Sequence, residues 1–259
     1  MNILVCIKQV PDTELQILPN EDGSDIKRDG IKYVVNPYDE YAIEEALKTK
    51  EKLKEGTVTV VSVGPERAKD AIRTALAMGC DEGILILQEE DIVDPLNAAK
   101  ILAGFIKEKG FDLILFGKQA IDDDSGIVGP AIAGILGMPQ ATNVVKLEIS
   151  QDKITAKCTR QIENGNAVVE CKLPVVVTAQ KGLNEPRYVS LPGIMKAKKK
   201  EIPVVNTGEL GLDALTPNIK ILKFQRPPER KSEHKIFSGE LPEVVEQTVN
   251  VLKEEVKVI

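Results

Sequence analysis

Short apolar runs alternate with longer amphipathic segments through the first half of the chain, and no other feature restricts the fold as strongly. Four apolar runs have the length of buried strands: residues 2–8, 57–63, 84–87 and 111–117. The segments with helical periodicity follow them: residues 38–54, 66–79, 96–110 and 126–137. This alternation predicts right-handed βαβ units. We therefore expect an α/β fold, a mostly parallel open sheet with helices on both faces.

Two helix starts carry the same signal. Asn36-Pro37 and Asp94-Pro95 each combine a capping residue with proline at the first helical position.

After about residue 143 the pattern changes to alternating polar and apolar residues, which predicts antiparallel strands over 144–150, 154–163, 164–174 and 174–179. Beyond residue 205 lies a charged, proline-rich tail with one amphipathic helix, 241–256. We expect a core (1–180), an exposed loop (181–205) and a C-terminal arm (206–259).

Composition excludes several functions. A net charge of −6 and 3% aromatic residues argue against nucleic-acid binding, which needs a basic surface and stacking rings. The four cysteines form no CxxC pair, and the single histidine, His234, lies in a polar segment. Zinc sites, Cys–His pairs and Ser–His–Asp triads therefore lack their residues. An enzyme that works through its own side chains is not expected.

No apolar run approaches the roughly 20 residues that span a bilayer. The N-terminal residues MNILVCIKQV lack both a basic region and a small-residue cleavage site, so we interpret them as a strand and not as a signal peptide. These features favour the bacterial cytoplasm, with reduced cysteines.

The loop at residues 117–128 is the best candidate for a ligand site. Open α/β sheets bind ligands beyond the carboxyl ends of their strands, and here a strand end is followed by a helix start near Ser125-Gly126. Free N–H groups at such a start suit a phosphate, and Gly126 and Gly129 would let it come close. The carboxylates at 122–124 would repel phosphate. They would cap the helix or accept from ribose hydroxyls, or form a solvated acidic turn. Neither GxGxxG nor GxxxxGK[ST] is present.

The segment SLPGIM at 190–195 raises a different question. It places Leu191, Ile194 and Met195 around a Pro192-Gly193 break, and Lys196, Lys198, Lys199 and Lys200 follow. We expect neither helix nor strand here, because proline and glycine would keep Leu191 out of regular structure. An apolar tip with a charged rim is typical of a surface for a transient partner.

Four stretches together resemble the β (small) subunits of electron transfer flavoproteins: residues 36–47, 73–79, 117–125 and 184–202. The resemblance covers nearly the whole chain in the same order, is most specific in 187–200, and loosens beyond about 205. It implies an adenine nucleotide alpha hydrolase-like core with a C-terminal arm. It also implies a heterodimer with a larger α subunit, which holds most of the redox-active FAD, while AMP is buried in the β subunit.

The family implies an electron carrier, not an enzyme. Electrons come from acyl-CoA dehydrogenases or related flavoenzymes, as in fatty acid β-oxidation, and pass to a membrane quinone oxidoreductase. Carried over by position, the cofactor-binding residues are Cys6, Asn36, Pro37, Tyr38, Asp39, Val63, Gly117, Asp122, Ser125, Gly126, Ile127 and Val128. Tyr38 would lie near the flavin, or else it is a core aromatic at the helix start. The partner-binding residues would be Leu191, Pro192, Ile194, Met195, Lys196 and Lys199. The alternatives without a partner are that Leu191 packs on the core of its own chain and that the lysines form a solvated basic face.

Three alternatives remain. A subfamily binds a second FAD in place of AMP and bifurcates electrons, but it carries threonines where this chain has no hydroxyl at 94–98, and Asp94 would meet the added phosphate. AMP is therefore favoured. A nucleotide-binding sensor module would explain the core but not residues 184–200. A nucleotide-hydrolysing enzyme lacks its Walker lysine and a positioned base.

Overall fold

The computed structural model describes residues 1–107, 109–212, 215–228 and 234–259. It divides into two compact units, Met1–Phe224 and Gln225–Ile259, which are treated separately. The predicted arm begins at residue 206, whereas 206–224 group with the first unit. Two contacts show why: β11 (Val204–Asn206) pairs with β5, and the backbone of Phe224 bonds to that of Gly23.

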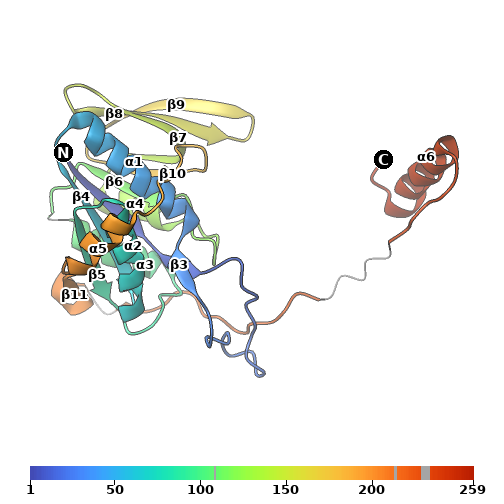
Figure 1. Cartoon of the computed structure of the whole chain (residues 1–259), viewed down its shortest axis with the longest axis horizontal. Helices are drawn as coiled ribbons and strands as arrows, with labels where there is room; N and C mark the ends of the chain where they lie inside the picture. The colour runs from blue at the N-terminus through green and yellow to red at the C-terminus, as the bar shows by residue number, and fades with distance from the viewer. Residues whose placement is uncertain (108, 213–214, 229–233) are drawn as a thin grey trace. The chain divides into compact units, whose positions relative to one another are not determined.

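The described part of the first unit is built on a nine-stranded sheet in the order β11-β5-β4-β1-β6-β10-β7-β8-β9 (Figure 1). The strands other than β11 have these bounds: β1 Asn2–Ile7, β4 Thr57–Gly64, β5 Glu82–Leu87, β6 Leu113–Gly117, β7 Gln140–Ile149, β8 Thr155–Ile162, β9 Gly165–Lys172 and β10 Val175–Ala179. Pairing is parallel from β11 through β7 and antiparallel from β7 to β9. A second, two-stranded antiparallel sheet joins β2 (Gln9–Pro11) to β3 (Tyr33–Val35). The predicted α/β class is confirmed.

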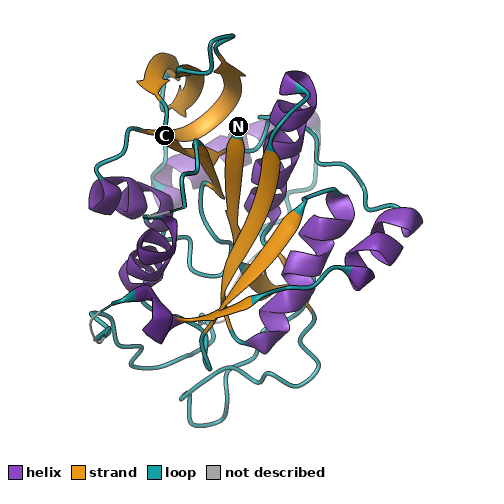
Figure 2. Ribbon diagram, turned by 90° about the vertical axis from the view of Figure 1, so that its left-hand side faces the viewer, coloured by secondary structure: helices purple, strands orange, loops and turns teal. Residues whose placement is uncertain are grey.

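Helices cover both faces of the large sheet (Figure 2). The helices of the first unit are α1 Pro37–Leu53, α2 Lys69–Met78 after a 3-10 turn (Glu66–Ala68), α3 Pro95–Ile106, α4 Val128–Leu136, α5 Leu191–Lys199 and a 3-10 turn at Thr207–Leu210. Strand β1 shows how the faces are set. Ile3, Val5 and Ile7 pack in one apolar cluster with α1 and α2, while Leu4 and Cys6 pack in the other with α3 and α4. Successive side chains of a strand point to opposite faces, so an unbroken apolar run is buried on both.

Strand β10 corrects the predicted antiparallel pattern over residues 174–179. It pairs in parallel with both β6 and β7, and all five of its residues are buried. The run VVVTA is uniformly apolar apart from one threonine, which is typical of a strand covered on both faces. The antiparallel prediction holds for the strands before it, β7, β8 and β9.

The segment SLPGIM is also corrected, because Leu191–Lys199 form helix α5. Pro192 lies in the first helical turn, where its missing N–H costs nothing, and the Ser190 hydroxyl accepts from the Gly193 N–H at 3.2 Å. Gly193 faces the Ala77 carbonyl of α2, where a side chain would collide. Proline and glycine therefore start this helix and seat it on α2.

The second unit contains α6 (Leu241–Asn250), continued by a π-helical turn over Val251–Val256. This confirms the terminal helix predicted for 241–256. Among the described residues, no helix combines the length and the apolar character needed to cross a bilayer.

Candidate functional site

A cavity of about 700 Å³ lies over the carboxyl ends of β1, β4 and β6. Strands β4 and β5, which follow β1 along the chain, lie on one side of β1 within the sheet. The next strand, β6, lies on the other side of β1. The strand order thus reverses between β1 and β6, the place where open α/β sheets bind ligands. The size suits a small-molecule or cofactor site. The expected position of the site therefore coincides with a real hollow.

Ten of the twelve predicted cofactor-binding residues line this cavity: Cys6, Asn36, Asp39, Val63, Gly117, Asp122, Ser125, Gly126, Ile127 and Val128. Pro37 and Tyr38 do not, although both neighbour Asn36 and Asp39 in the first turn of α1. The Tyr38 ring faces the Lys118 ammonium, 5.2 Å from its centroid. The cavity and the aromatic ring are thus separate features of the same helix start.

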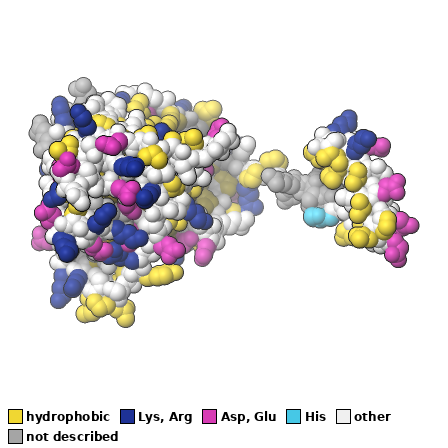
Figure 3. All heavy atoms as spheres, turned by 90° about the horizontal axis from the view of Figure 1, so that it is seen from above, with side chains coloured by type: hydrophobic (Ala, Val, Ile, Leu, Met, Phe, Trp, Pro, Cys, Tyr) yellow, Lys and Arg dark blue, Asp and Glu magenta, His cyan; other side chains and the backbone are white. Residues whose placement is uncertain are grey.

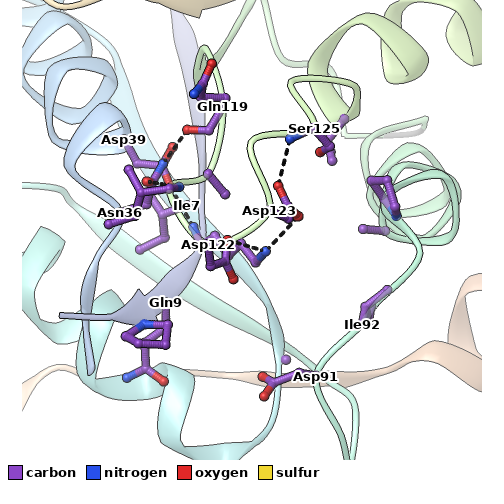
Figure 4. A pocket seen from close by; sticks show the side chains of 18 of the residues that line it. Ile7, Gln9, Asn36, Asp39, Asp91, Ile92, Gln119, Asp122, Asp123 and Ser125 are labelled. Carbon is purple, nitrogen blue, oxygen red and sulfur yellow. Dashed lines mark hydrogen bonds and ion pairs between the residues drawn. The ribbon is translucent and has the colours of Figure 1, made fainter. Parts of the chain in front are cut away.

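Asp39 joins the ends of the two central strands. Its Oδ2 accepts from the Lys8 N–H at 2.7 Å, just beyond β1, and its Oδ1 accepts from the Gly117 N–H at 3.0 Å, at the end of β6 (Figure 4). The residue is only 5% exposed, and burial raises the pKa of its carboxyl to about 7. A side chain at Gly117 would collide with Asp39 and Tyr38. Asp39 therefore fixes the floor of the cavity.

Asn36 acts differently from the predicted cap. It occupies the N-cap position of α1, but its side chain makes no cap bond to the helix. Instead its Nδ2 donates to the Gln119 carbonyl at 2.9 Å, and its Oδ1 accepts from the Ile121 N–H at 3.2 Å (Figure 4). The reason is that the loop after β6 runs past α1 and presents its own unpaired backbone groups. Asn36 thus holds the cavity wall.

The carboxylates at 122–124 are all engaged by neighbouring groups, and Asp122 and Asp123 line the cavity. Lys8 Nζ contacts Asp122 Oδ1 at 2.8 Å and Asp123 Oδ2 at 3.0 Å, and Asp123 Oδ1 also accepts from the Ser125 N–H at 2.9 Å. Asp124 Oδ1 accepts from Gln119 Nε2 at 2.5 Å. None caps α4, whose N-cap position is held by Ile127, so the capping alternative is wrong. Lys8 offsets one of the three negative charges that would repel an anion.

Helix α4 begins at Val128, two to three residues later than predicted. Its first N–H groups lack partners within the helix. Ile127 and Val128, at this helix start, line the cavity. Gly126 adopts a φ of +59°, which glycine accepts without strain. Gly129 has a further role, because a side chain there would lie 2.8 Å from Thr178 Cγ2. It lets α4 pack closely on the sheet.

The opposite wall was not predicted. Arg67 lies over the Tyr33 ring at 3.9 Å, donates to Gln9 Oε1 at 2.6 Å, and contacts Asp91 at 2.5 Å. Arg28, from the long connection between β2 and β3, also contacts Asp91 at 2.8 Å. Ile221 and Phe224 line the cavity from the end of the first unit. No local sequence pattern indicates that these distant segments come together, so their contacts could not be predicted from the sequence.

Other chemistry is sparse here. Burial, and secondarily Asp39, raise the pKa of the Cys6 thiol, which disfavours the nucleophilic thiolate. In the described part of the chain, no three His, Cys, Asp or Glu side chains are grouped so as to hold a metal ion. The cavity offers hydrogen-bonding groups and a helix start, which suit binding.

The predicted partner-binding residues lie together on α5, away from the cavity. Leu191 is 78% exposed, Met195 66% and Ile194 38%. Lys196, Lys198 and Lys199 occupy the last turn of the helix, where positive charge suits the helix dipole. Lys200 is less available than expected, because its Nζ donates to the carbonyls of Cys80 and Asp81 at 2.8 and 2.7 Å. Tyr188, which was not among the predicted contacts, is almost fully exposed beside them.

Comparisons with known proteins give one family. The model of the electron transfer flavoprotein domain matches residues 24–210. Electron transfer flavoprotein subunit beta of Bacillus subtilis is 44% identical and that of Bradyrhizobium diazoefficiens 43%, each over the full length of both chains. The human subunit beta is 41% identical over 98% of this chain and 97% of its own length.

Proposed function

We propose that this chain pairs with an α subunit and buries AMP. The premise is that the chain belongs to the electron transfer flavoprotein family as a β-subunit chain. Members of this family are electron carriers, and the flavin supplies the one- and two-electron chemistry. On this proposal FAD is held mainly by the α subunit, and this chain supplies support and contact.

The observation that carries the AMP proposal is the cavity at the β1/β6 crossover point. Asp39 and Asn36 hold its floor and wall, and the N-terminus of α4 offers free N–H groups and the positive end of the helix dipole to a phosphate. Carboxylates at 122–123 stay within reach of hydroxyl groups. These groups fit a nucleoside monophosphate.

The start of α3 supports AMP over a second FAD. Asp94 Oδ1 accepts from the Leu96 N–H at 2.9 Å, and Oδ2 accepts from the Asn218 N–H at 2.7 Å. The Asn218 hydrogen bonds also lower the pKa of this carboxyl, so it stays ionised. The helix start thus already holds an internal anion, and an added phosphate would meet its charge. Bifurcation remains the alternative within the family.

The cofactor test is a nucleotide count. The chain is co-expressed with its α subunit, the heterodimer is purified and denatured, and the released nucleotides are separated. One FAD and one AMP per heterodimer are expected. Two FAD would overturn the AMP assignment, and a stable homodimer of this chain that binds ATP and never recruits flavin would favour a sensor module.

The partner proposal concerns α5. We propose that Leu191 is the apolar anchor for acyl-CoA dehydrogenases or related flavoenzymes, with Ile194 and Met195 filling the contact and Lys196 and Lys199 on its rim. A membrane quinone oxidoreductase would then accept the electrons. Leu191→Ala should leave nucleotide content unchanged and slow reduction by an acyl-CoA dehydrogenase severalfold or more, since losing one central anchor typically costs about 2 kcal/mol or more. Unchanged rates would refute the anchor.

A further inference from the structure

The connection between β10 and α5 has no regular structure, yet one side chain ties it to the core. Arg187 Nε donates to Glu44 Oε2 at 2.8 Å and Nη2 to Glu44 Oε1 at 3.0 Å. Its Nη1 and Nη2 donate to the two oxygens of Glu51 at 2.8 and 3.2 Å. The Arg187 backbone N–H adds a bond to Glu44 Oε2 at 3.1 Å. One residue thus makes five hydrogen bonds to one helix.

The geometry needs arginine. Glu44 and Glu51 are seven residues apart on α1, which is about two helical turns along the same face. A planar guanidinium presents its N–H groups as a fork and can grip both carboxylates at once, whereas a lysine ammonium is a compact point charge. The Glu44 side chain is 3% exposed and the Glu51 side chain 60% exposed, so the two grips differ in burial. We call these three residues the Arg187 clamp.

A second contact strengthens the same attachment. Asn184 Nδ2 donates to the Tyr41 carbonyl at 3.0 Å and to Glu45 Oε2 at 2.9 Å, again on α1. The far side of the segment is fixed to α2, where Arg73 donates to the Ala197 carbonyl at 3.1 Å and Ala197 is buried. The chain between these attachments carries the exposed apolar side chains.

Those side chains form a docking ridge, defined as Tyr188, Leu191, Ile194 and Met195. Tyr188 directly follows the clamped arginine, and its side chain is 99% exposed. Figure 3 shows hydrophobic side chains on the surface of the first unit interspersed with Lys and Arg. Exposed apolar side chains have few packing contacts that could fix their position. Contacts of the neighbouring residues must therefore order this segment.

We propose that Arg187 is a positioning residue that holds the docking ridge in its binding arrangement through the Arg187 clamp. The inference rests on the proposed docking function of α5. Ordering a flexible surface during association weakens binding, and a surface ordered beforehand avoids that loss. The clamp makes no contact with a partner in this account. It determines the fraction of molecules in which the ridge already has its binding arrangement before an acyl-CoA dehydrogenase with an apolar pocket binds.

The first experiment needs no partner. Hydrogen exchange is measured on the purified heterodimer for the parent protein, Arg187→Lys and Arg187→Ala. Faster exchange over residues 188–195, with the rest of the first unit unchanged, is expected for both variants. A lysine ammonium cannot reproduce the forked grip that the guanidinium makes on the buried Glu44 carboxylate. Parent-like exchange in Arg187→Lys would overturn the proposal, since charge alone would then suffice.

The second experiment reads docking. With an acyl-CoA dehydrogenase as the reductant, Arg187→Lys should raise the KM for the heterodimer about tenfold and leave kcat nearly unchanged, because the ridge still reaches its place once bound. Glu44→Gln should act like Arg187→Lys. Glu51→Gln is the matched control, the same change at the exposed grip, and should have a smaller effect. Equal effects of the two glutamine variants, or a loss in kcat alone, would overturn the proposal.

Two further variants separate the possible failures. Arg187→Ala combined with Glu44→Gln removes the buried charge together with its partner, so the ridge can be tested even if Arg187→Ala alone does not fold. Leu191→Ala tests the proposed docking function itself. If Leu191→Ala raises the KM and the clamp variants do not, the clamp inference fails alone. If Leu191→Ala has no effect, the docking function fails, and the clamp inference fails with it.

Discussion

Asp39 is a carboxylate in a place that water scarcely reaches, and the structure uses it to close the joint between β1 and β6. Hydrogen bonds from Lys8 and Gly117 favour its charged form, but burial outweighs them and raises the pKa to about 7. In an unfolded chain the same group titrates near pH 4. The folded protein therefore keeps a proton between about pH 4 and pH 7 that the unfolded chain has released.

This difference has a definite sign. The stabilisation linked to the Asp39 proton is complete below about pH 4 and is lost as the pH rises through 7. In Asp39→Asn the linkage disappears. The unfolding free energy of the parent minus that of the variant should fall by about 3 kcal/mol between pH 5 and pH 8. The fall is about 1.4 kcal/mol for each of the two pH units between pH 5 and the folded pKa of about 7. Urea unfolding of the heterodimer at several pH values measures it.

The control for this prediction is Asp124, which lies on the loop after β6 next to the cavity-lining Asp123. Asp124→Asn removes a carboxylate from this loop. Asp124 has a φ of 52°, which asparagine also tolerates. Its difference from the parent should stay constant over the same pH range. A constant difference for Asp39→Asn as well would contradict the role given to the buried carboxyl.

Residue types alone predicted part of the site. Strand ends and the loop at 117–128 were placed because apolar runs and a glycine-bounded helix start are local patterns. The pairing of Asn36 with Gln119 and Ile121 was not predictable, since it depends on a loop more than eighty residues away. The ion pair between Arg67 and Asp91 was not predictable either, because the two residues lie in different connections of the fold. Local signals identify which segments border a site, and tertiary packing decides which side chains meet.

At the scale of elements, composition can suggest the wrong type. SLPGIM contains the two residues most often read as breaks, yet both fall in the first turn of α5, where proline is tolerated. Strand β10 has an ordinary length, but its uniform burial shows that it belongs to the parallel part of the sheet. In each case the position within the element, more than the residue type, carries the information.

The connection between β2 and β3 lines the cavity, and we expect it to hold the site closed over a ligand. Arg28 brings it to Asp91, which also binds Arg67, and Phe224 donates from its N–H to the Gly23 carbonyl at 2.9 Å. Asp91→Asn should therefore speed release of bound nucleotide by a few-fold, since partly exposed ion pairs contribute at most about 1 kcal/mol each. Displacement by excess labelled AMP measures the rate. Glu90→Gln, an exposed carboxylate beside it, should release nucleotide at the parent rate, and equal rates in all three proteins would reject this closing role.

At the scale of the whole molecule, helix α1 connects the two proposed activities. Its first turn carries Asp39 and follows Asn36 at the cavity, and its later turns carry Glu44 and Glu51 at the Arg187 clamp. One rigid element thus supports both the cavity and the exposed ridge. An adenine nucleotide that takes no part in electron transfer would, on this view, still contribute to the surface that meets the partner.

Helix α6 of the second unit has an exposed apolar face that no other described residue of that unit covers. Leu241, Val245 and Val249 repeat at four-residue spacing on α6 and are 75%, 52% and 44% exposed. Such a stripe is typical of a helix that packs against another surface, and the α subunit is the partner that the family provides. Val245→Asp should weaken the heterodimer, because burying one valine contributes about 1.5–3 kcal/mol and a charge in its place costs more. Sedimentation at decreasing concentration measures the dissociation. Glu243→Gln, on the opposite side of the same helix, should dissociate like the parent. If Val245→Asp does so too, the stripe does not contact the α subunit.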